Sequence, residues 1–295
     1  MRVHIAAACG FCYGVRRAVE LAAQAEAGTH TLGPIIHNPQ LVDSLSEKGV
    51  TPVNSLAEVA DGSRLLIRSH GVGPDVYDEA EKRRLHIVDA TCPHVKKAQQ
   101  DARKVINAKK VLVIIGEKDH PEVISISQWG GNRAIIIDKV EEAEEIPYCE
   151  TMGVVVQTTF SQSRFKQIES VLAGKTGHLD VYMTICAATR QRQEAAVELA
   201  GKVDAMIVIG GRNSANTGRL AQVCAEQGCP TYHVETAAEI NPDDFAGMHD
   251  IGVTAGASTP DWIIQEVVKM MEDLQTEGTE VMSEELLDQY DYEEN

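Results

Sequence analysis

The sequence predicts an α/β protein built from three similar units with parallel sheets. Short β-branched runs alternate with amphipathic, alanine-rich segments along most of the 295 residues, which is typical of strands joined by crossover helices. The same order of elements recurs three times, and such repetition usually means that one supersecondary unit has been copied and packed against itself. We therefore expect three α/β units around a pseudo-threefold axis.

Each repeat starts from an extended stretch that ends at a cysteine and continues into a helix. The three segments read HIAAACGFCYGVRRAVELA, HIVDATCPHVKKAQQDA and VYMTICAATRQRQEAAVELA, with aligned cysteines at Cys12, Cys92 and Cys186. Unit boundaries are expected near residues 90 and 185.

The predicted units cover residues 13–90, 91–185 and 186–280, and the N-terminal strand within residues 1–12 completes the sheet of the third unit. Residues 283–295 carry six acidic residues and no basic residue, and we predict that this tail is disordered.

Two further strands of each unit are followed by polar residues. The first strand ends at a glycine, and the residues four positions after that glycine are His37, His120 and Ser214. The second ends at His70, at Thr158 with Thr159, and at Ser258. Ligands bind outside the carboxyl ends of strands in open parallel sheets. If these ends point inward, the three cysteines and the polar residues share one central cavity.

Composition argues against several classes of protein. A net charge of −17, from 27 Lys and Arg against 44 Asp and Glu, does not suit binding to nucleic acid. No stretch approaches the roughly 18 apolar residues of a membrane span. Seven cysteines without an export signal indicate reduced thiols. We expect a cytoplasmic protein that binds neither nucleic acid nor membrane.

The three aligned cysteines suit a metal centre assembled by tertiary structure. Their spacing matches no zinc finger and no bacterial ferredoxin. Three thiolates on an iron–sulfur cluster leave one iron open to water or substrate. The remaining cysteines have no counterparts in the repeat, so we interpret them as buried: Cys9, Cys149, Cys224 and Cys229. A thioredoxin-like pair of Cys9 with Cys12 is the alternative use of Cys12.

Turn-rich loops around His37 and His70 suit an anion pocket. Their sequences are GPIIHNP and RSHGVGP, and nearby helix N-termini would attract a diphosphate. Ser214, Asn216 and Ser258 add neutral donors. Taken singly, each loop could equally be a turn capped by its own polar side chains.

The second unit places an imidazole beside a carboxylate. The segment Asp119-His120-Pro121-Glu122 follows a strand, and Thr158 arrives from the neighbouring strand. This arrangement suits a proton donor beside a redox centre. The alternative is an exposed carboxylate that opens a helix, where the helix dipole favours it.

Nine ordered motifs resemble the LytB or IspH reductases over about residues 1 to 270. They are GFCYGV, GPIIHNP, RSHGV, DATCPHV, HPEV, QTT, TICAAT, NSANT and GAS. Three positions depart from the usual family pattern: Ala215 stands where a second serine is common, Ser125 where glycine is frequent, and Tyr13 where phenylalanine is common.

The resemblance implies a [4Fe-4S] cluster held by Cys12, Cys92 and Cys186, with an open iron for the hydroxyl oxygen of the substrate. It also implies which residues contact the substrate. The diphosphate would be held by His37, His70, Ser214, Asn216 and Ser258, and the hydroxyl end by His120, Glu122 and Thr158, with Glu122 delivering a proton.

The implied activity is the reduction of 4-hydroxy-3-methylbut-2-enyl diphosphate to isopentenyl and dimethylallyl diphosphates, the last step of the non-mevalonate isoprenoid pathway. Reduced flavodoxin or ferredoxin would supply the electrons. Two alternatives stay open from the residues alone. One is a Cys₃His zinc hydrolase that uses the same cavity, and the other is a diphosphate-binding protein without catalysis.

Overall fold

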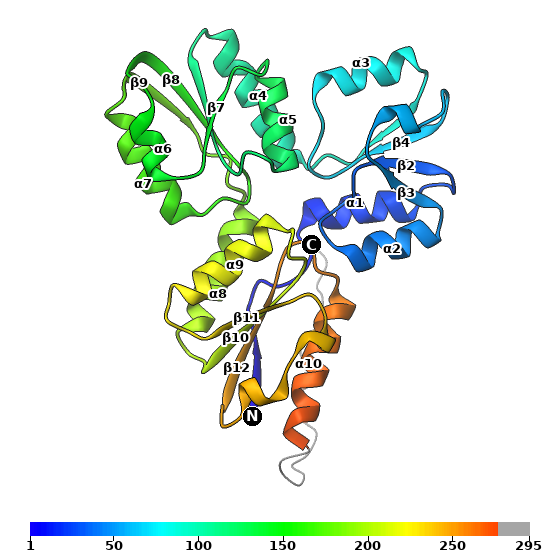
Figure 1. Ribbon diagram of the computed structural model, residues 1–295, viewed down its shortest axis with the longest axis vertical. Coiled ribbons are helices and arrows are strands. Elements are labelled where there is room, and N and C mark those ends of the chain that lie inside the picture. Colours follow the sequence, from blue (N-terminus) through cyan, green and yellow to red (C-terminus); the bar gives the residue numbers. More distant parts are fainter. Residues whose placement is uncertain (277–295) are drawn as a thin grey trace, which may run out of the picture.

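Three four-stranded parallel sheets make up the fold. The structure is a computed structural model that describes residues 1–276, so the predicted tail and the last residues of the third predicted unit lie outside the described residues. The sheet orders are β3-β2-β4-β5, β7-β6-β8-β9 and β11-β10-β12-β1. The same order recurs in each sheet, and Figure 1 shows the three lobes meeting at a common centre. The predicted fold class is confirmed.

The first lobe contains the sheet of β2 to β5 and the helices around it. Proline at the first position starts α2 and α3, where a missing N–H costs nothing. The elements are α1 (Tyr13–Ala23), β2 (Thr29–Leu32), α2 (Pro39–Glu47), β3 (Val50–Val53), the 3₁₀ turn Leu56–Glu58, β4 (Arg64–Ile67), α3 (Pro74–Lys82) and β5 (His86–Asp89).

The second lobe has the longest central strand. Its elements are α4 (Pro93–Asn107), β6 (Val111–Ile115), α5 (Pro121–Trp129), β7 (Ile135–Ile137), α6 (Val140–Glu145), β8 (Cys149–Val156), α7 (Gln162–Ala173) and β9 (Thr176–Tyr182).

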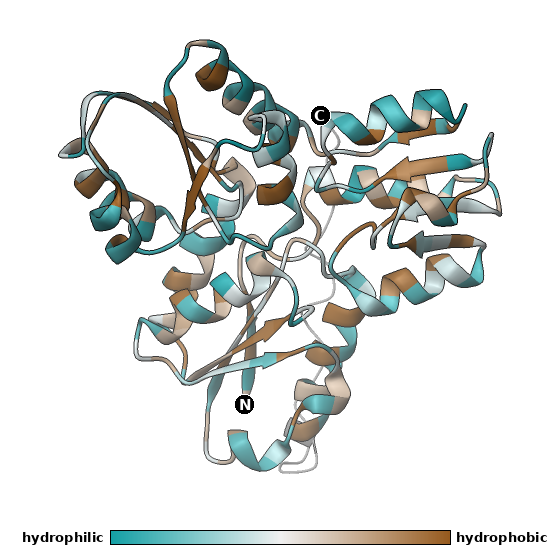
Figure 2. Ribbon diagram, turned by 45° about the horizontal axis from the view of Figure 1, so that its top comes forward, coloured by the Kyte–Doolittle hydropathy of each residue, from teal (hydrophilic) through white to brown (hydrophobic). Residues whose placement is uncertain are grey.

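The central strands of the sheets are apolar because helices cover both of their faces. In β6, Val113 and Ile115 pack into the core that includes α7, whereas Leu112 and Ile114 pack into the core that includes α4 and α5. Successive side chains of a strand point to opposite faces, so a doubly covered strand is hydrophobic throughout. Figure 2 shows these strands in brown between helices whose outer faces are teal.

The third lobe combines both ends of the described chain. Strand β1 pairs in parallel with β12, with Ile5 opposite Val253. The elements are β1 (Arg2–Ile5), α8 (Ala187–Ala200), β10 (Ala205–Ile209), α9 (Ala215–Ala225), β11 (Thr231–Val234), the 3₁₀ turns Ala237–Glu239 and Pro242–Phe245, β12 (Asp250–Ala255) and α10 (Asp261–Thr276).

Each aligned cysteine connects two lobes. The edge strands β1, β5 and β9 lead to Cys12, Cys92 and Cys186, which cap α1, α4 and α8. Each of these helices packs on the sheet that follows it in sequence. The three cysteines therefore lie at the centre because the chain crosses there from lobe to lobe. The boundaries between units that we predicted near residues 90 and 185 stay predictions.

Candidate functional site

All eleven predicted site residues line one cavity of about 110 Å³ where the lobes meet. The lining includes the three aligned cysteines, three histidines from two lobes, a carboxyl from the second lobe and two serines and an asparagine from the third. The site residues are Cys12, His37, His70, Cys92, His120, Glu122, Thr158, Cys186, Ser214, Asn216 and Ser258.

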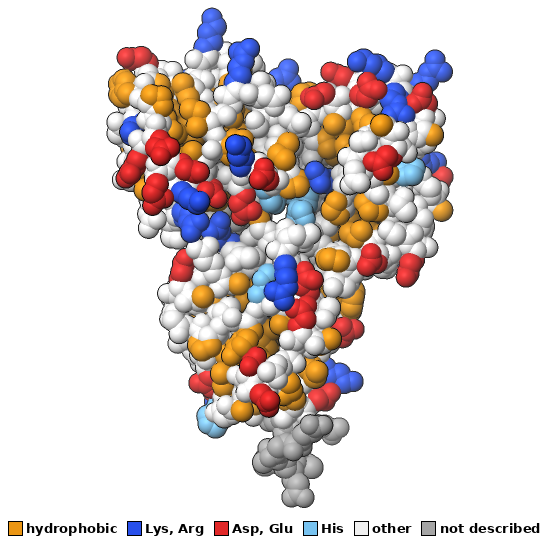
Figure 3. All heavy atoms as spheres, viewed as in Figure 1, with side chains coloured by type: hydrophobic (Ala, Val, Ile, Leu, Met, Phe, Trp, Pro, Cys, Tyr) orange, Lys and Arg blue, Asp and Glu red, His pale blue; other side chains and the backbone are white. Residues whose placement is uncertain are grey.

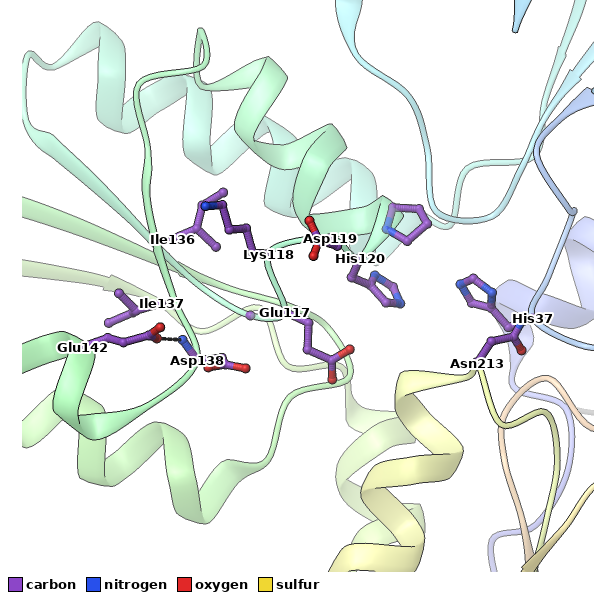
Figure 4. Close-up of a pocket in the computed structure, with 12 residues that line it drawn as sticks. His37, Glu117, Lys118, Asp119, His120, Ile136, Ile137, Asp138, Glu142 and Asn213 are labelled. Atoms are coloured by element: carbon purple, nitrogen blue, oxygen red, sulfur yellow. Dashed lines mark hydrogen bonds between the residues drawn. The ribbon is translucent and has the colours of Figure 1, made fainter. Parts of the chain in front are cut away.

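This inner cavity opens beside a larger hollow of about 590 Å³, and His37 and His120 line both. Figure 4 shows these two rings facing each other across the hollow, with Asn213 beside His37. In the space-filling view, histidine side chains appear at the bottom of the depression between the lobes (Figure 3). A small molecule can therefore approach the inner cavity past the histidines.

The three cysteines are half-buried free thiols at helix N-termini. The Sγ of Cys186 accepts the backbone N–H of Thr189 at 3.3 Å. Burial raises the pKa of Cys92 to about 11 and also raises the pKa of Cys186. A free thiolate is thus disfavoured here, whereas a bound metal centre offsets that cost with its own positive charge. The dipoles of the three helices also favour the thiolate form, because their positive ends lie at the cysteines.

The spacing of the thiols bears on the kind of metal centre that they could hold. Within residues 1–276, the only three potential ligands close enough together for one ion are His37, His70 and His120. A tetrahedral zinc, with Zn–S bonds of about 2.3 Å, needs its thiolates in close contact. The three cysteines are not such a group, and thiols that surround a cavity suit the larger body of an iron–sulfur cluster.

The three histidines form a compact group. Ring centroids of His37 and His70 lie 4.4 Å apart, and the ring of His120 lies 5.5 Å and 5.4 Å from them. Both ring nitrogens of His37 and Nδ1 of His70 are buried without a partner. Burial lowers the pKa of His37 to about 4 and that of His120 to about 3, and lowers the pKa of His70 well below its usual value. Unpaired buried nitrogens are costly, so this group is built to contact a ligand.

Glu122 is enclosed beside the histidines. It is 2% exposed, which rules out the alternative of an exposed carboxylate at the start of a helix. The backbone N–H and the hydroxyl of Thr158 donate to its two oxygens at 2.6 and 2.8 Å. Burial raises its pKa to about 7, although these hydrogen bonds act in the opposite direction. Glu122 can therefore hold a proton near neutral pH, as a general acid must.

Neutral donors of the third lobe face the histidine loop of the first. The hydroxyl of Ser258 donates to the His37 carbonyl at 3.2 Å and to the Ser214 hydroxyl at 3.3 Å. Ser214 caps α9 by accepting the N–H of Thr217, and Nδ2 of Asn216 is buried without a partner. A helix N-terminus lined with small donors is suited to an anion.

The sequence predicted no role for two residues that support the site. Ser125 donates to the carbonyl oxygens of His70 and Glu122 at 3.1 and 2.9 Å, so it joins the first two lobes. Arg192 donates to the carbonyl of Gly10 and holds the loop before Cys12. The departure of Ser125 from the family pattern could have indicated its role. No feature of the sequence indicated the role of Arg192, because basic residues are common on helices.

The cysteines outside the repeat stay away from the inner cavity. Cys9 packs on the core of the third lobe, where burial raises its pKa to about 11. Cys224 and Cys229 belong to another core of the same lobe, and Cys149 packs beside the core of the second. A thiol as buried as that of Cys9 is a poor redox nucleophile, so the structure does not favour a pair of Cys9 with Cys12.

Comparison with known proteins identifies similar sequences along almost the whole chain. The profile of the family described as LytB protein matches residues 3–272. A 4-hydroxy-3-methylbut-2-enyl diphosphate reductase of Pelobacter propionicus is 48% identical over 271 residues, which cover 91% of this chain and 96% of that protein. The enzyme of the same name from Geotalea uraniireducens is 46% identical over 275 residues, which cover 92% of this chain and 97% of that protein.

Two solved structures share the fold. The E-1-hydroxy-2-methyl-but-2-enyl-4-diphosphate reductase from Plasmodium falciparum has a TM-score of 0.87 at 27% identity, covering 93% of this chain and 87% of its own. A structure of (E)-4-hydroxy-3-methyl-but-2-enyl diphosphate reductase, described as the terminal enzyme of the non-mevalonate pathway, has a TM-score of 0.66 at 40% identity. The match covers 92% of this chain and 100% of the chain in that structure.

Proposed function

This chain belongs to the LytB family, and we propose that it is an iron–sulfur reductase that converts 4-hydroxy-3-methylbut-2-enyl diphosphate to isopentenyl and dimethylallyl diphosphates. The observation that carries the proposal is that three free thiols, a buried carboxyl and three histidines, two of them with unpaired ring nitrogens, line one small cavity. Redox, acid and anion-binding groups thus lie within reach of one substrate.

The proposed reaction takes up two electrons and two protons and releases water. The C–O bond to the substrate hydroxyl breaks, one proton completes the water, and the other adds to either of two carbons, which accounts for two products. A [4Fe-4S] cluster on Cys12, Cys92 and Cys186 would supply the electrons and a Lewis-acidic iron.

Glu122 is the proposed proton donor. Its carboxyl has a pKa of about 7 and is fixed by two hydrogen bonds from Thr158. A donor with a pKa near the working pH combines a protonated resting state with easy release of the proton. His120 lies next to it and accepts the Glu122 backbone N–H at Nδ1, which leaves Nε2 for the hydroxyl end of the substrate.

The diphosphate would lie against the histidines of the first lobe and the donors of the third. His37 and His70 present unpaired ring nitrogens, and Ser214, Asn216 and Ser258 surround the N-terminus of α9. Binding from two lobes at once holds the substrate in a single orientation, which lowers the entropic barrier to reaction.

The electron donor is proposed to be reduced flavodoxin or ferredoxin. In each repeat, the fourth residue after the cysteine is basic, and its backbone N–H donates to the cysteine carbonyl one helical turn away. Arg16 and Arg190 are exposed, and Lys96 is half-exposed. An acidic carrier is attracted to such a ring of cations, although the chain as a whole is acidic. Seven free cysteines also support a reducing, cytoplasmic location.

The proposal is tested by anaerobic purification followed by measurement of iron and acid-labile sulfide per chain. About four of each would fit a [4Fe-4S] cluster, and adding the hydroxylated diphosphate should perturb its absorption spectrum. With a reduced viologen as electron source, both products should form.

Two results would contradict the proposal. Zinc without sulfide would favour the hydrolase, although the separation of the thiols argues against it. Diphosphate binding with no metal after reconstitution, and no turnover, would leave a binding protein.

A further inference from the structure

Arg68 is a cation near the histidine group that lacks a counter-charge. It follows β4 directly and precedes His70 by two residues. Its side chain is half-buried, and its Nε is enclosed without a hydrogen-bond partner. Across residues 1–276, no hydrogen bond or ion pair engages its guanidinium. A buried charge without a partner is costly, so its retention needs a reason.

The guanidinium lies close to the loop that carries His37. It lies over Gly33, where an added Cβ would collide with Nη1 and approach Cζ to 3.1 Å. The φ of Gly33 is +73°, a conformation that other residues rarely adopt. Glycine at this position therefore serves both the turn after β2 and the space that Arg68 occupies.

The charge of Arg68 acts on the histidine group. It contributes to the lowered pKa of His37, His70 and His120, after the larger effect of burial. The same field would repel a metal ion from the three rings, although their nitrogens are close enough together to bind one. A cation that holds three histidines neutral attracts an anion to the same place.

Other charges around the two cavities do not neutralise Arg68. The charged residues of the inner cavity are Glu122, which forms no ion pair with Arg68, and Arg192, which donates hydrogen bonds to backbone carbonyls. The outer hollow carries the remaining charged side chains, which are Glu117, Lys118, Asp119, Asp138 and Glu142.

We propose that Arg68 is a positioning residue that makes the three-histidine pocket select a diphosphate, by supplying a permanent positive charge close to the loop that carries His37 and two residues before His70. Arg68 lines neither cavity, so it acts through the histidines rather than by touching the ligand. The inference rests on the proposed function and deepens it, because the other diphosphate contacts are neutral in the empty cavity. Arg68 supplies the permanent charge that they lack.

The test compares binding of inorganic diphosphate to the cluster-loaded protein by calorimetry in wild type, Arg68→Gln and Arg68→Lys. Arg68→Gln should bind roughly ten- to hundredfold more weakly, as expected when one charge is removed near a partly buried anion. Arg68→Lys should stay within about threefold of wild type, because it keeps the charge. The KM for the hydroxylated substrate should rise with the dissociation constant while kcat changes little.

The matched control is Arg64→Gln. Arg64 begins the same strand, is exposed and pairs with Glu26 far from the cavity, so its loss should leave diphosphate binding unchanged. The pH profile adds a readout that a packing role would not change. In Arg68→Gln the pKa of the histidines rises, so binding should recover more steeply below about pH 6.5 than in wild type.

The inference is wrong if Arg68→Gln, with normal cluster content and thermal stability, binds inorganic diphosphate as tightly as wild type. It is also wrong if Arg68→Lys loses as much affinity as expected for Arg68→Gln, and this result decides the matter even if Arg68→Gln fails to fold. If wild type itself does not bind diphosphate, the proposed function fails first.

Discussion

Thr158 binds both oxygens of the Glu122 carboxyl, through its backbone N–H at 2.6 Å and its hydroxyl at 2.8 Å. Glu122 lies on the first turn of α5 and Thr158 just after β8, so two neighbouring strand ends of one sheet determine the orientation of the acid. The two hydrogen bonds hold the enclosed carboxyl in place, whereas burial raises its pKa to about 7 and lets it keep a proton near neutral pH.

Replacing Glu122 with glutamine should abolish turnover without preventing substrate binding. Glutamine keeps the shape of the side chain but cannot donate a carboxylic proton, and general acid catalysis contributes about 10²- to 10⁴-fold. We expect kcat to fall by that factor in an assay with a reduced viologen. Iron and sulfide content and the spectral response to substrate should persist.

Glu117→Gln is the control for this variant, because Glu117 lines the outer hollow but not the inner cavity. Normal turnover by Glu122→Gln would remove Glu122 from its role as proton donor.

Thr158→Val should shift the pH dependence of kcat. The Thr158 hydroxyl lowers the pKa of Glu122, so its removal raises that pKa further. The protonated acid is the active form, and the limb on which kcat falls with rising pH, near pH 7 in wild type, should move to higher pH. Thr158→Ser keeps the hydroxyl and should retain the wild-type profile. A common profile for all three proteins would mean that this hydrogen bond does not tune the acid.

Serine at position 12, 92 or 186 should destroy the metal centre. A serine hydroxyl is a far poorer ligand for iron than a thiolate, so most of the iron and labile sulfide should be lost. Cys149→Ser is the matched control, since Cys149 is also half-buried but packs beside the core of the second lobe, where its thiol bonds to Thr151 and Thr176. Full cluster content in any of the first three variants would contradict the assignment of that ligand.

The histidine group should make the ligand-free protein sensitive to acid. The folded pKa of His37 is about 4, below the unfolded value of about 6.5. The unfolded chain therefore binds the proton more readily, and stability is lost as pH falls from about 6.5 towards 4. His37 alone should cost on the order of 1–2 kcal/mol between pH 7 and 5.

Urea unfolding at these two pH values checks this prediction. His37→Asn should lose part of the difference in stability, whereas His86→Asn, at an exposed position of β5, should keep it. Inorganic diphosphate should reduce the difference in wild type, because the anion stabilises protonated histidines. An unchanged slope in His37→Asn would mean that other groups cause the acid sensitivity.

Charge reversal near the cysteines should slow delivery of electrons by a protein donor. With Arg16→Glu and Arg190→Glu together, we expect the rate with reduced flavodoxin or ferredoxin at low salt to fall about three- to tenfold or more, through slower association. The rate with a small viologen should not change. Lys48→Glu, at the far end of α2, serves as the control, and equal rates for all variants would place the donor on another surface.

The three-unit α/β fold and the residues at the strand ends could be predicted from the amino-acid sequence. Strand and helix patterns are local, and each repeat carries its own glycine, cysteine and polar residues in one order, so Cys12, Cys92 and Cys186 were recognisable as equivalents. The motifs then identified the family. These features could be predicted because each depends on residues close together in the chain.

The contacts that those residues make across lobes and between neighbouring strands became visible only in the tertiary structure. It encloses Glu122 beside Thr158, links Ser125 to the His70 loop, brings three histidine rings into one compact group and leaves the Nε of Arg68 without a hydrogen-bond partner. Burial then sets the pKa values of the acid and the rings. Burial and distance depend on how distant segments pack, and no local pattern in the sequence encodes them.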